Sequence, residues 1–298
     1  MDTLKSAIQY DTIEHSSTFG ISAMDGRGFY YPCDTAIGNN GRLYVVNRSL
    51  DNITGRGIRV TMCDLQGNYY GTFGSHGQDE GQFMWPSCAA VDGMDNVYVS
   101  DEYTHYISVF DQDGKYLHRW GGHGVGEGKL DGPSGIAFDS AGNLFVSDTH
   151  NHRVQKFTTN GEFLYSFPSG IQGECLSLPW GLTVSPGGDI YVADWGNDRI
   201  QRFSPKGDLV GTYGESGMGN GQFRGPSSVA VDDYGYMCVA DWGNEQLQLL
   251  DPDGKFLMRT RGESKLSEWA TNFLKINNEE AEARSRSNLE PKLDFDPS

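Results

Sequence analysis

The chain has 298 residues, and its 40 acidic and 23 basic side chains give a formal net charge of −17. This charge repels phosphate backbones and anionic lipid, so it disfavours nucleic-acid binding and favours cationic partners or metal ions. No window approaches the roughly 18 consecutive apolar residues of a membrane span, and the first residues lack the basic start and apolar run of a secretory signal. We therefore expect no membrane contact and a cytoplasmic location.

The chain contains a repeat, and residues 69–86 end its first complete copy. Near the N-terminus, the segment Glu14–Pro32 aligns with these residues. In both segments a glycine, Gly20 or Gly74, lies 12 residues before a proline. We expect this segment to supply the outer strand of a further, incomplete unit whose inner strands come from the C-terminal side. Such a strand would clasp a ring of units shut.

Five repeat units follow, and each opens with a proline: Pro32, Pro86, Pro133, Pro179 and Pro226. The third unit contains four runs rich in β-branched and aromatic residues, at 134–139, 143–148, 153–158 and 162–167, with glycine-containing turns between the first and second and between the third and fourth. A period in the mid-forties with four strands in each unit is typical of β-propeller blades. We predict an all-β propeller over residues 1–262 with five full blades, starting near 32, 86, 133, 179 and 226, and an incomplete sixth.

Residues 263–298 do not continue the repeat. Ser267–Arg286 has a helical pattern with Trp269, Phe273 and Ile276 on one stripe. We expect a partly helical acidic tail, which corresponds to an insertion before a missing last blade. On this hypothesis the ring is six-bladed and the chain stops short of its last blade; the alternative is a five-bladed ring with the N-terminal strand docked elsewhere.

The third unit, PSGIAFDSAGNLFVSDTHNHRVQKFTTNGEFLYSF, resembles the NHL repeat, whose signature combines P-x-G-[IV]-A-V-D, a strand ending in Asp, and R-[IV]-Q-x-F. The resemblance extends over roughly residues 16–262. It implies a propeller of NHL blades and leaves the activity open, because such blades serve unrelated functions.

An aspartate ends the second strand of four units: Asp101, Asp148, Asp194 and Asp241. Asn47 replaces it in the first unit. These residues are candidates for binding on the loop-rich face, around the mouth of the central channel. The structural alternative is that each carboxylate accepts hydrogen bonds from the next turn. Arg153 and Arg199 are further candidates, and we expect them to pair with a neighbouring repeat aspartate.

Histidines and tryptophans gather in the same loops. His105 and His152 each lie four residues after the repeat aspartate, and imidazole with carboxylate suits zinc or another divalent metal. Trp195 and Trp242, in the two copies of VADWGN, either pack on a neighbouring loop or stand exposed as ligand contacts. The sequence predicts no other cofactor.

We therefore predict a monomeric binding scaffold, unless another chain supplies a missing blade, whose loop-rich face takes a protein, a peptide or a small cationic ligand. The alternative is a metal-dependent lyase or hydrolase, with its ion in the channel near His105 and His152. Such an enzyme would resemble the peptidyl-hydroxyglycine lyases, although Cys33, Ser87, Ser134, Trp180 and Ser227 stand where that family has a histidine after the proline. RNA binding, known for some NHL proteins, ranks third because of the negative charge.

Overall fold

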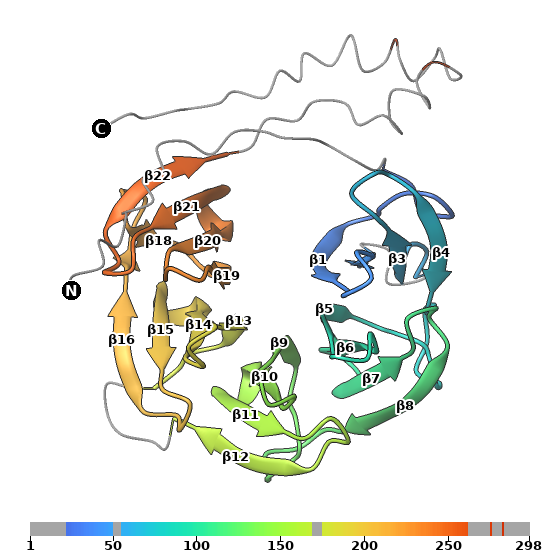
Figure 1. The fold of residues 1–298 in the computed structure, drawn as a ribbon, viewed down its shortest axis with the longest axis horizontal. Coiled ribbons are helices and arrows are strands. Elements are labelled where there is room, and N and C mark those ends of the chain that lie inside the picture. The colour runs from blue at the N-terminus through green and yellow to red at the C-terminus, as the bar shows by residue number, and fades with distance from the viewer. Residues whose placement is uncertain (1–21, 50–54, 169–174, 262–274, 276–281, 283–298) are drawn as a thin grey trace, which may run out of the picture.

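The computed structural model describes residues 22–49, 55–168 and 175–261, together with Lys275 and Glu282. These residues form five four-stranded antiparallel sheets arranged around a common axis (Figure 1). In every sheet, strands that follow one another in sequence pair with one another, and the first strand lies innermost. The prediction of an all-β propeller with five blades is confirmed.

Each blade begins at its repeat proline. Blade 1 comprises β1 (Pro32–Ile37), β2 (Leu43–Asn47), β3 (Arg59–Cys63) and β4 (Tyr69–Phe73). Blade 2 comprises β5 (Pro86–Val91), β6 (Val97–Asp101), β7 (Tyr106–Phe110) and β8 (Tyr116–Gly121). Blade 3 comprises β9 (Pro133–Phe138), β10 (Leu144–Asp148), β11 (Arg153–Phe157) and β12 (Phe163–Phe167). Blade 4 comprises β13 (Pro179–Val184), β14 (Ile190–Asp194), β15 (Arg199–Phe203) and β16 (Leu209–Tyr213). Blade 5 comprises β19 (Pro226–Val231), β20 (Met237–Asp241), β21 (Gln246–Leu250) and β22 (Phe256–Thr260).

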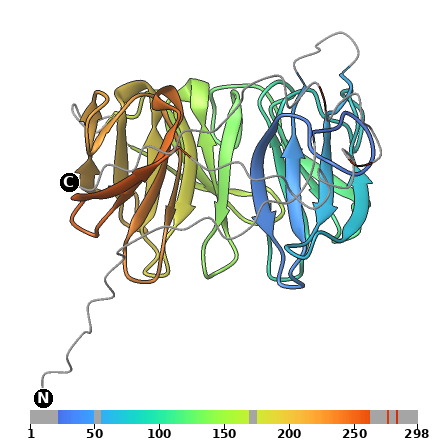
Figure 2. The same ribbon diagram turned by 90° about the horizontal axis from the view of Figure 1, so that it is seen from above.

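Tight turns join the strands on one side of the ring. In blade 3, Gly142 and Gly161 adopt φ of 80° and 82°, which glycine reaches without the steric penalty of a side chain. The carboxylate of Asp139 accepts hydrogen bonds from the amides of Ala141 and Asn143 and so closes the first of these turns. The remaining loops lie on the opposite side of the ring. Figure 2 shows the ring edge-on, with both of these sides in view.

Short 3-10 helices follow the second strand in three blades: η1 (Thr149–Asn151), η2 (Trp195–Asn197) and η3 (Trp242–Asn244). The crossings from one blade to the next contain a parallel bridge, His76 with Phe83 and His123 with Leu130. Between blades 4 and 5 this bridge widens into the strand pair β17 (Glu215–Ser216) and β18 (Gln222–Phe223). Ser22 and Phe29 form the same bridge before blade 1, at the position given by the alignment of Gly20 with Gly74.

The hydrophobic core lies between the blades. Four clusters of buried side chains occupy the four junctions from blade 1 to blade 5, and each combines strands of two neighbouring blades. Phe110 and Val46 pack in the first of these clusters, and Phe203 and Phe145 in the third. Each blade is therefore stabilised chiefly by its neighbours, as in other repeat proteins.

The expectation of six blades is not met by the described residues, which form five. Blades 1 and 5 leave an opening between them (Figure 1), and some side chains on either side of it are exposed, although Leu43, Val45 and Cys63 of blade 1 form a buried cluster. Ile37 in β1 is 66% exposed, and Leu247 in β21 is 42% exposed, whereas its equivalent Ile200 in blade 4 is fully buried. The predicted N-terminal strand lies largely outside the described residues.

The predicted tail helix, Ser267–Arg286, also lies outside the described residues, except that Lys275 and Glu282 have helical conformation. It stays a prediction. Within the described part of the chain, no helix has the length and hydrophobicity that a membrane crossing needs.

Candidate functional site

The repeat aspartates lie beneath the loop-rich face and are completely enclosed. In blade 3, one oxygen of Asp148 accepts a hydrogen bond of 2.6 Å from the backbone amide of Asp131 in the preceding crossing. The other oxygen accepts bonds of 2.8 Å from Arg153 Nε and from Gln155 Nε2. The carboxylate thus joins the crossing, the loop and the third strand of its own blade.

The same arrangement recurs around the ring. The repeat residue of each blade accepts a bond from the backbone amide two residues before the opening proline, as seen for Asn47, Asp101, Asp194 and Asp241. Arg199 pairs with Asp194 at 2.8 Å, so Arg153 and Arg199 bind the aspartate of their own blade. These contacts join parts of the fold, so they give a structural role to all six charged candidates: Asp101, Asp148, Asp194, Asp241, Arg153 and Arg199. A direct role of these residues in ligand binding stays a prediction.

The residue four positions after the aspartate links each blade to the next one. His105 Nδ1 accepts a hydrogen bond of 3.0 Å from the amide of Gly132, and His152 Nδ1 accepts one of 3.1 Å from the amide of Leu178. Asp198 Oδ1 does the same for Gly225 at 2.7 Å. Histidine in blades 2 and 3 and aspartate in blade 4 can occupy this position because both offer a hydrogen-bond acceptor.

Because each histidine binds the crossing that follows its own blade, the two histidines that the sequence suggested as a metal pair lie at different junctions. His105 lies at the junction of blades 2 and 3, and His152 lies at the junction of blades 3 and 4. Desolvation lowers the pKa of His105, against the opposing effect of the nearby Asp131 carboxylate. His105 instead approaches His123 and Asp131, which the sequence analysis did not combine with it.

The mouth of the central channel is a cavity of about 390 Å³ on the loop-rich face. Apart from Pro32, the residues that line it come from two repeat positions, the one after the opening proline and the one after the repeat aspartate or asparagine. Its lining residues are Pro32, Cys33, Arg48, Ser87, Trp180, Trp195, Ser227 and Trp242. No histidine of the described residues lines the mouth, so His105 and His152 do not form a metal site there.

One side of the mouth is polar. Arg48 Nε donates a hydrogen bond of 2.7 Å to the carbonyl of Pro86, and its guanidinium also binds Ser87 and forms an ion pair with Glu102. In blade 3, Ser134 and Thr149 share a hydrogen bond of 2.6 Å at the same two repeat positions. The charge of Arg48 is therefore already balanced within the protein.

The other side of the mouth is aromatic. The rings of Trp180 and Trp195 lie 6.1 Å apart and are tilted by 46°. Trp195 also packs over Gly225 of blade 5, where a Cβ would lie 2.6 Å from the indole nitrogen. Trp242 is 68% exposed. Trp195 thus combines packing with a place in the cavity wall, and Trp242 offers most of its ring to solvent.

Below the mouth, a second cavity of about 560 Å³ runs between the innermost strands and shares Cys33, Ser87, Trp180 and Ser227 with it. Asp34 is the only charged side chain among its lining residues. Desolvation raises the pKa of the Asp34 carboxyl, and hydrogen bonds from Cys88 and from the amide of Ala89 oppose that rise. The wall of the channel is therefore anionic when Asp34 is ionised.

Sequence reasoning missed Trp180, Arg48 and Asp34 as site residues. A signal for Trp180 was present, because it is the only aromatic residue among the five that follow an opening proline. Arg48 and Asp34 carried no comparable signal. They belong to blade 1, and only the curvature of the ring makes them line the same cavities as tryptophans of blades 4 and 5, Arg48 at the mouth and Asp34 in the channel.

Two of the five blades match a described family directly. The NHL repeat model matches residues 130–157 and 176–203, which span the first three strands of blades 3 and 4. The chain is a β-propeller that contains NHL repeats. No curated protein matches the sequence of this propeller.

Solved structures with a similar fold include enzymes and a protein complex. A streptogramin B lyase is 15% identical with a TM-score of 0.56, over 80% of this chain and 70% of the lyase. A catalytically inactive virginiamycin B lyase from Staphylococcus aureus with quinupristin is 13% identical with a TM-score of 0.53, over 84% of this chain and 92% of the lyase. A nidogen–laminin complex contains a chain that is 20% identical with a TM-score of 0.56, over 76% of this chain and 79% of that one. At these identities the likeness concerns the fold alone.

Proposed function

We propose that this NHL propeller is a binding scaffold, and that its channel mouth binds a cationic group, either on a peptide or protein or as a small molecule. The observation that carries the proposal is the combination of an aromatic wall at the mouth with a carboxyl group, that of Asp34, in the channel below it. Trp180, Trp195 and Trp242 line the mouth, and Asp34 is the one charged residue among those lining the channel below it. Arg48 does not oppose a cation strongly, because it is paired with Glu102.

Tryptophan faces attract ammonium and guanidinium groups through the ring quadrupole, by about 0.5–1 kcal/mol at exposed sites and about 2 kcal/mol where the cation is desolvated. The mouth contains both kinds of ring, an exposed one and a partly desolvated one, because Trp242 is largely exposed and Trp180 is half-buried. The overall charge of −17 adds a long-range attraction for cations.

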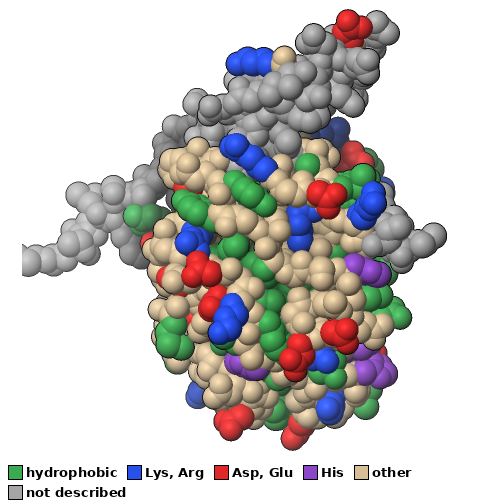
Figure 3. All heavy atoms as spheres, turned by 90° about the vertical axis from the view of Figure 1, so that its right-hand side faces the viewer, with side chains coloured by type: hydrophobic (Ala, Val, Ile, Leu, Met, Phe, Trp, Pro, Cys, Tyr) green, Lys and Arg blue, Asp and Glu red, His purple; other side chains and the backbone are tan. Residues whose placement is uncertain are grey.

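The solved structures with the same fold are compatible with a binding face without selecting a ligand. One of them is a lyase with quinupristin, and another is a complex of nidogen with laminin. On the side of the ring shown in Figure 3, basic side chains are interspersed with acidic ones and form no broad basic area. This distribution favours a peptide or small cation over a nucleic acid.

A peptide panel tests the proposal. Glycine-flanked peptides with a central lysine, trimethyl-lysine, leucine or glutamate are titrated into the full chain by calorimetry at pH 7. We expect the lysine and trimethyl-lysine peptides to bind and the glutamate peptide not to bind. Trp180→Ala should weaken binding by about 10- to 30-fold and Trp242→Ala by about two- to fivefold, because a cation–π contact contributes up to about 2 kcal/mol at a desolvated ring and about 0.5–1 kcal/mol at an exposed one.

Asp34 adds a pH dependence to the same assay. The cation is attracted by the ionised carboxylate, so binding should weaken as the pH falls through the pKa of Asp34, which burial places above its usual value. Asp34→Asn should weaken binding at pH 7 and remove that dependence. Tyr234→Ala is the matched control, because Tyr234 is an exposed aromatic in the turn between β19 and β20, on the opposite side of the ring. Equal binding of the glutamate peptide, or an equal loss in Tyr234→Ala, contradicts the proposal.

A further inference from the structure

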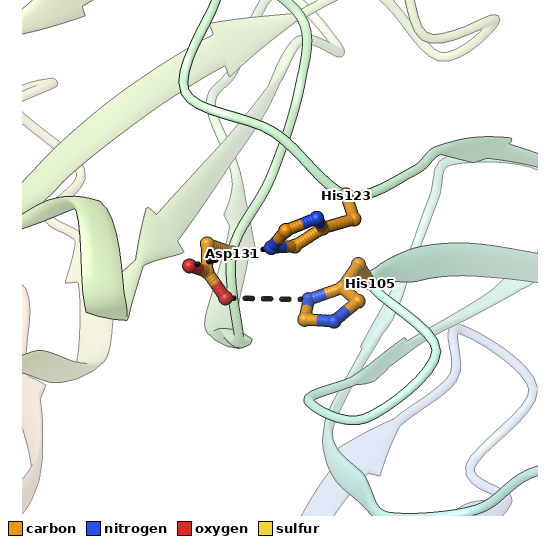
Figure 4. Close-up of side chains that lie close together, drawn as sticks. All are labelled: His105, His123 and Asp131. Atoms are coloured by element: carbon orange, nitrogen blue, oxygen red, sulfur yellow. Dashed lines mark ion pairs between the residues drawn. The ribbon is translucent and has the colours of Figure 1, made fainter.

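A second group of chemically active side chains lies at the junction of blades 2 and 3, outside the channel mouth. His105 follows β6, His123 and Asp131 belong to the crossing from β8 to β9, and His150 lies in η1. Figure 4 shows the imidazoles of His105 and His123 turned toward the carboxylate of Asp131. Three separate segments of two blades thus meet at one carboxylate.

The distances within this group are close to those of a coordination sphere. His105 Nδ1 lies 3.5 Å from one oxygen of Asp131, and His123 Nε2 lies 3.6 Å from the other. One ligand atom from each of the three residues lies within 4.8 Å of the other two. Ligand atoms on a tetrahedral zinc ion with bonds of 2.0–2.1 Å are about 3.3 Å apart. His123 is 69% exposed, so its side chain is free to make the small remaining movement.

The fold of the junction does not require these residue types. At the junction of blades 4 and 5, the residues equivalent to His105, His123 and Asp131 are Asp198, Ser216 and Arg224. Ser216 there donates a hydrogen bond of 2.6 Å to Asp198, so the two positions meet in the absence of histidine. Serine also replaces Asp131 in blade 4, as Ser177.

We propose that His105, His123 and Asp131 bind a zinc ion that clamps blade 2 to blade 3. Two imidazoles and a carboxylate are typical zinc ligands, and three protein ligands leave a fourth position for water. His150 Nδ1 lies 3.2 Å from Asp131 and positions the carboxylate, as partners of metal ligands commonly do. His105 Nδ1 exchanges its hydrogen bond from Gly132 for the metal.

The site is independent of the proposed ligand site, because none of these four residues lines the channel mouth or the channel. It keeps one member of the histidine pair suggested by the sequence, His105, and replaces His152 with two residues of the next crossing. The ligands come from a loop of one blade and a crossing of the next, so zinc binding should hold the two blades together.

Zinc titration of the full chain, stripped with a chelator and followed by calorimetry and thermal melting, tests this site. We expect one zinc ion per chain and a higher melting temperature in its presence. His123→Ser and Asp131→Ser, which copy the residues of blades 5 and 4, should weaken zinc binding by about 100-fold or more, and His150→Ala by about tenfold. Both serine variants should melt like the metal-free protein.

His76→Ser is the matched control. His76 occupies the position of His123 in the preceding crossing, where Met84 and Tyr103 stand in place of Asp131 and His150. Zinc binding should be unchanged in this variant. The proposal is overturned if the unaltered chain binds no more zinc than His123→Ser does, or if His76→Ser loses as much affinity as His123→Ser.

Discussion

At the scale of single residues, the repeat aspartate is the most demanding position of the fold. Asp148→Ala would leave Arg153 and the amide of Asp131 without their common acceptor in a buried site. Breaking a buried ion pair in this way costs about 3–5 kcal/mol. We expect the free energy of unfolding, measured by urea denaturation at pH 7, to fall by that amount.

Asp148→Asn should cost less, about 1–3 kcal/mol, because an amide oxygen still accepts some of these bonds. Blade 1 shows how the chain accommodates asparagine. Asn47 accepts a hydrogen bond from the amide of Tyr30, and its own amide donates to Thr61, which replaces the glutamine of blades 3, 4 and 5. Asp113→Ala is the control, since its ion pair with Arg42 lies at the surface and contributes less than about 1 kcal/mol. A loss in Asp148→Ala no larger than in Asp113→Ala would contradict the structural role.

At the scale of elements, the residue four positions after the aspartate should be exchangeable between blades. His152 and Asp198 both adopt a left-handed backbone, with φ of 55° and 53°, and both accept a bond from the next crossing. His152→Asp should therefore change the free energy of unfolding little, whereas His152→Ala should lower it by about 1 kcal/mol. Amide hydrogen exchange at Leu178 would accelerate only in the alanine variant. Equal exchange rates in both variants would show that the side chain does not hold this crossing.

The contact between this residue and the next crossing shows which parts of the structure the sequence could predict. The strands within a blade were predictable, and the contacts between blades were not. Strands such as Arg153–Phe157 were predictable because each blade forms from consecutive hairpins whose turns and alternation are local in sequence. Contacts between blades depend on how far a loop reaches toward the next crossing. His105 and His152 share a repeat position and for that reason lie apart, and His123 and Asp131 join His105 because they precede the next blade.

At the scale of the whole molecule, the repeat pattern predicted the five blades but could not predict how the ring closes. A repeat fixes the shape of one blade, whereas closure depends on the angle between blades, which the packing at each junction sets. The four junctions are filled by large aromatic and aliphatic side chains. The opening between blades 1 and 5 leaves side chains such as Ile37 and Leu247 exposed. The channel mouth spans the same opening, since Arg48 and Trp242 stand on its two sides.

This opening leads to a prediction that contrasts two equivalent positions. Ile200 in β15 is fully buried by blade 5, and Leu247, its equivalent in β21, is 42% exposed. Ile200→Lys places a charge in a filled junction and should cost more than about 4 kcal/mol, a large part of the roughly 5–15 kcal/mol by which a typical domain is stable. Leu247→Lys should change the free energy of unfolding by less than about 0.5 kcal/mol, as surface substitutions do. Urea denaturation of both variants, with sedimentation to follow association, distinguishes an open edge from a covered one. If Leu247→Lys is nearly as destabilising as Ile200→Lys, or separates an assembly into single chains, then another segment or another chain covers blade 5 in solution.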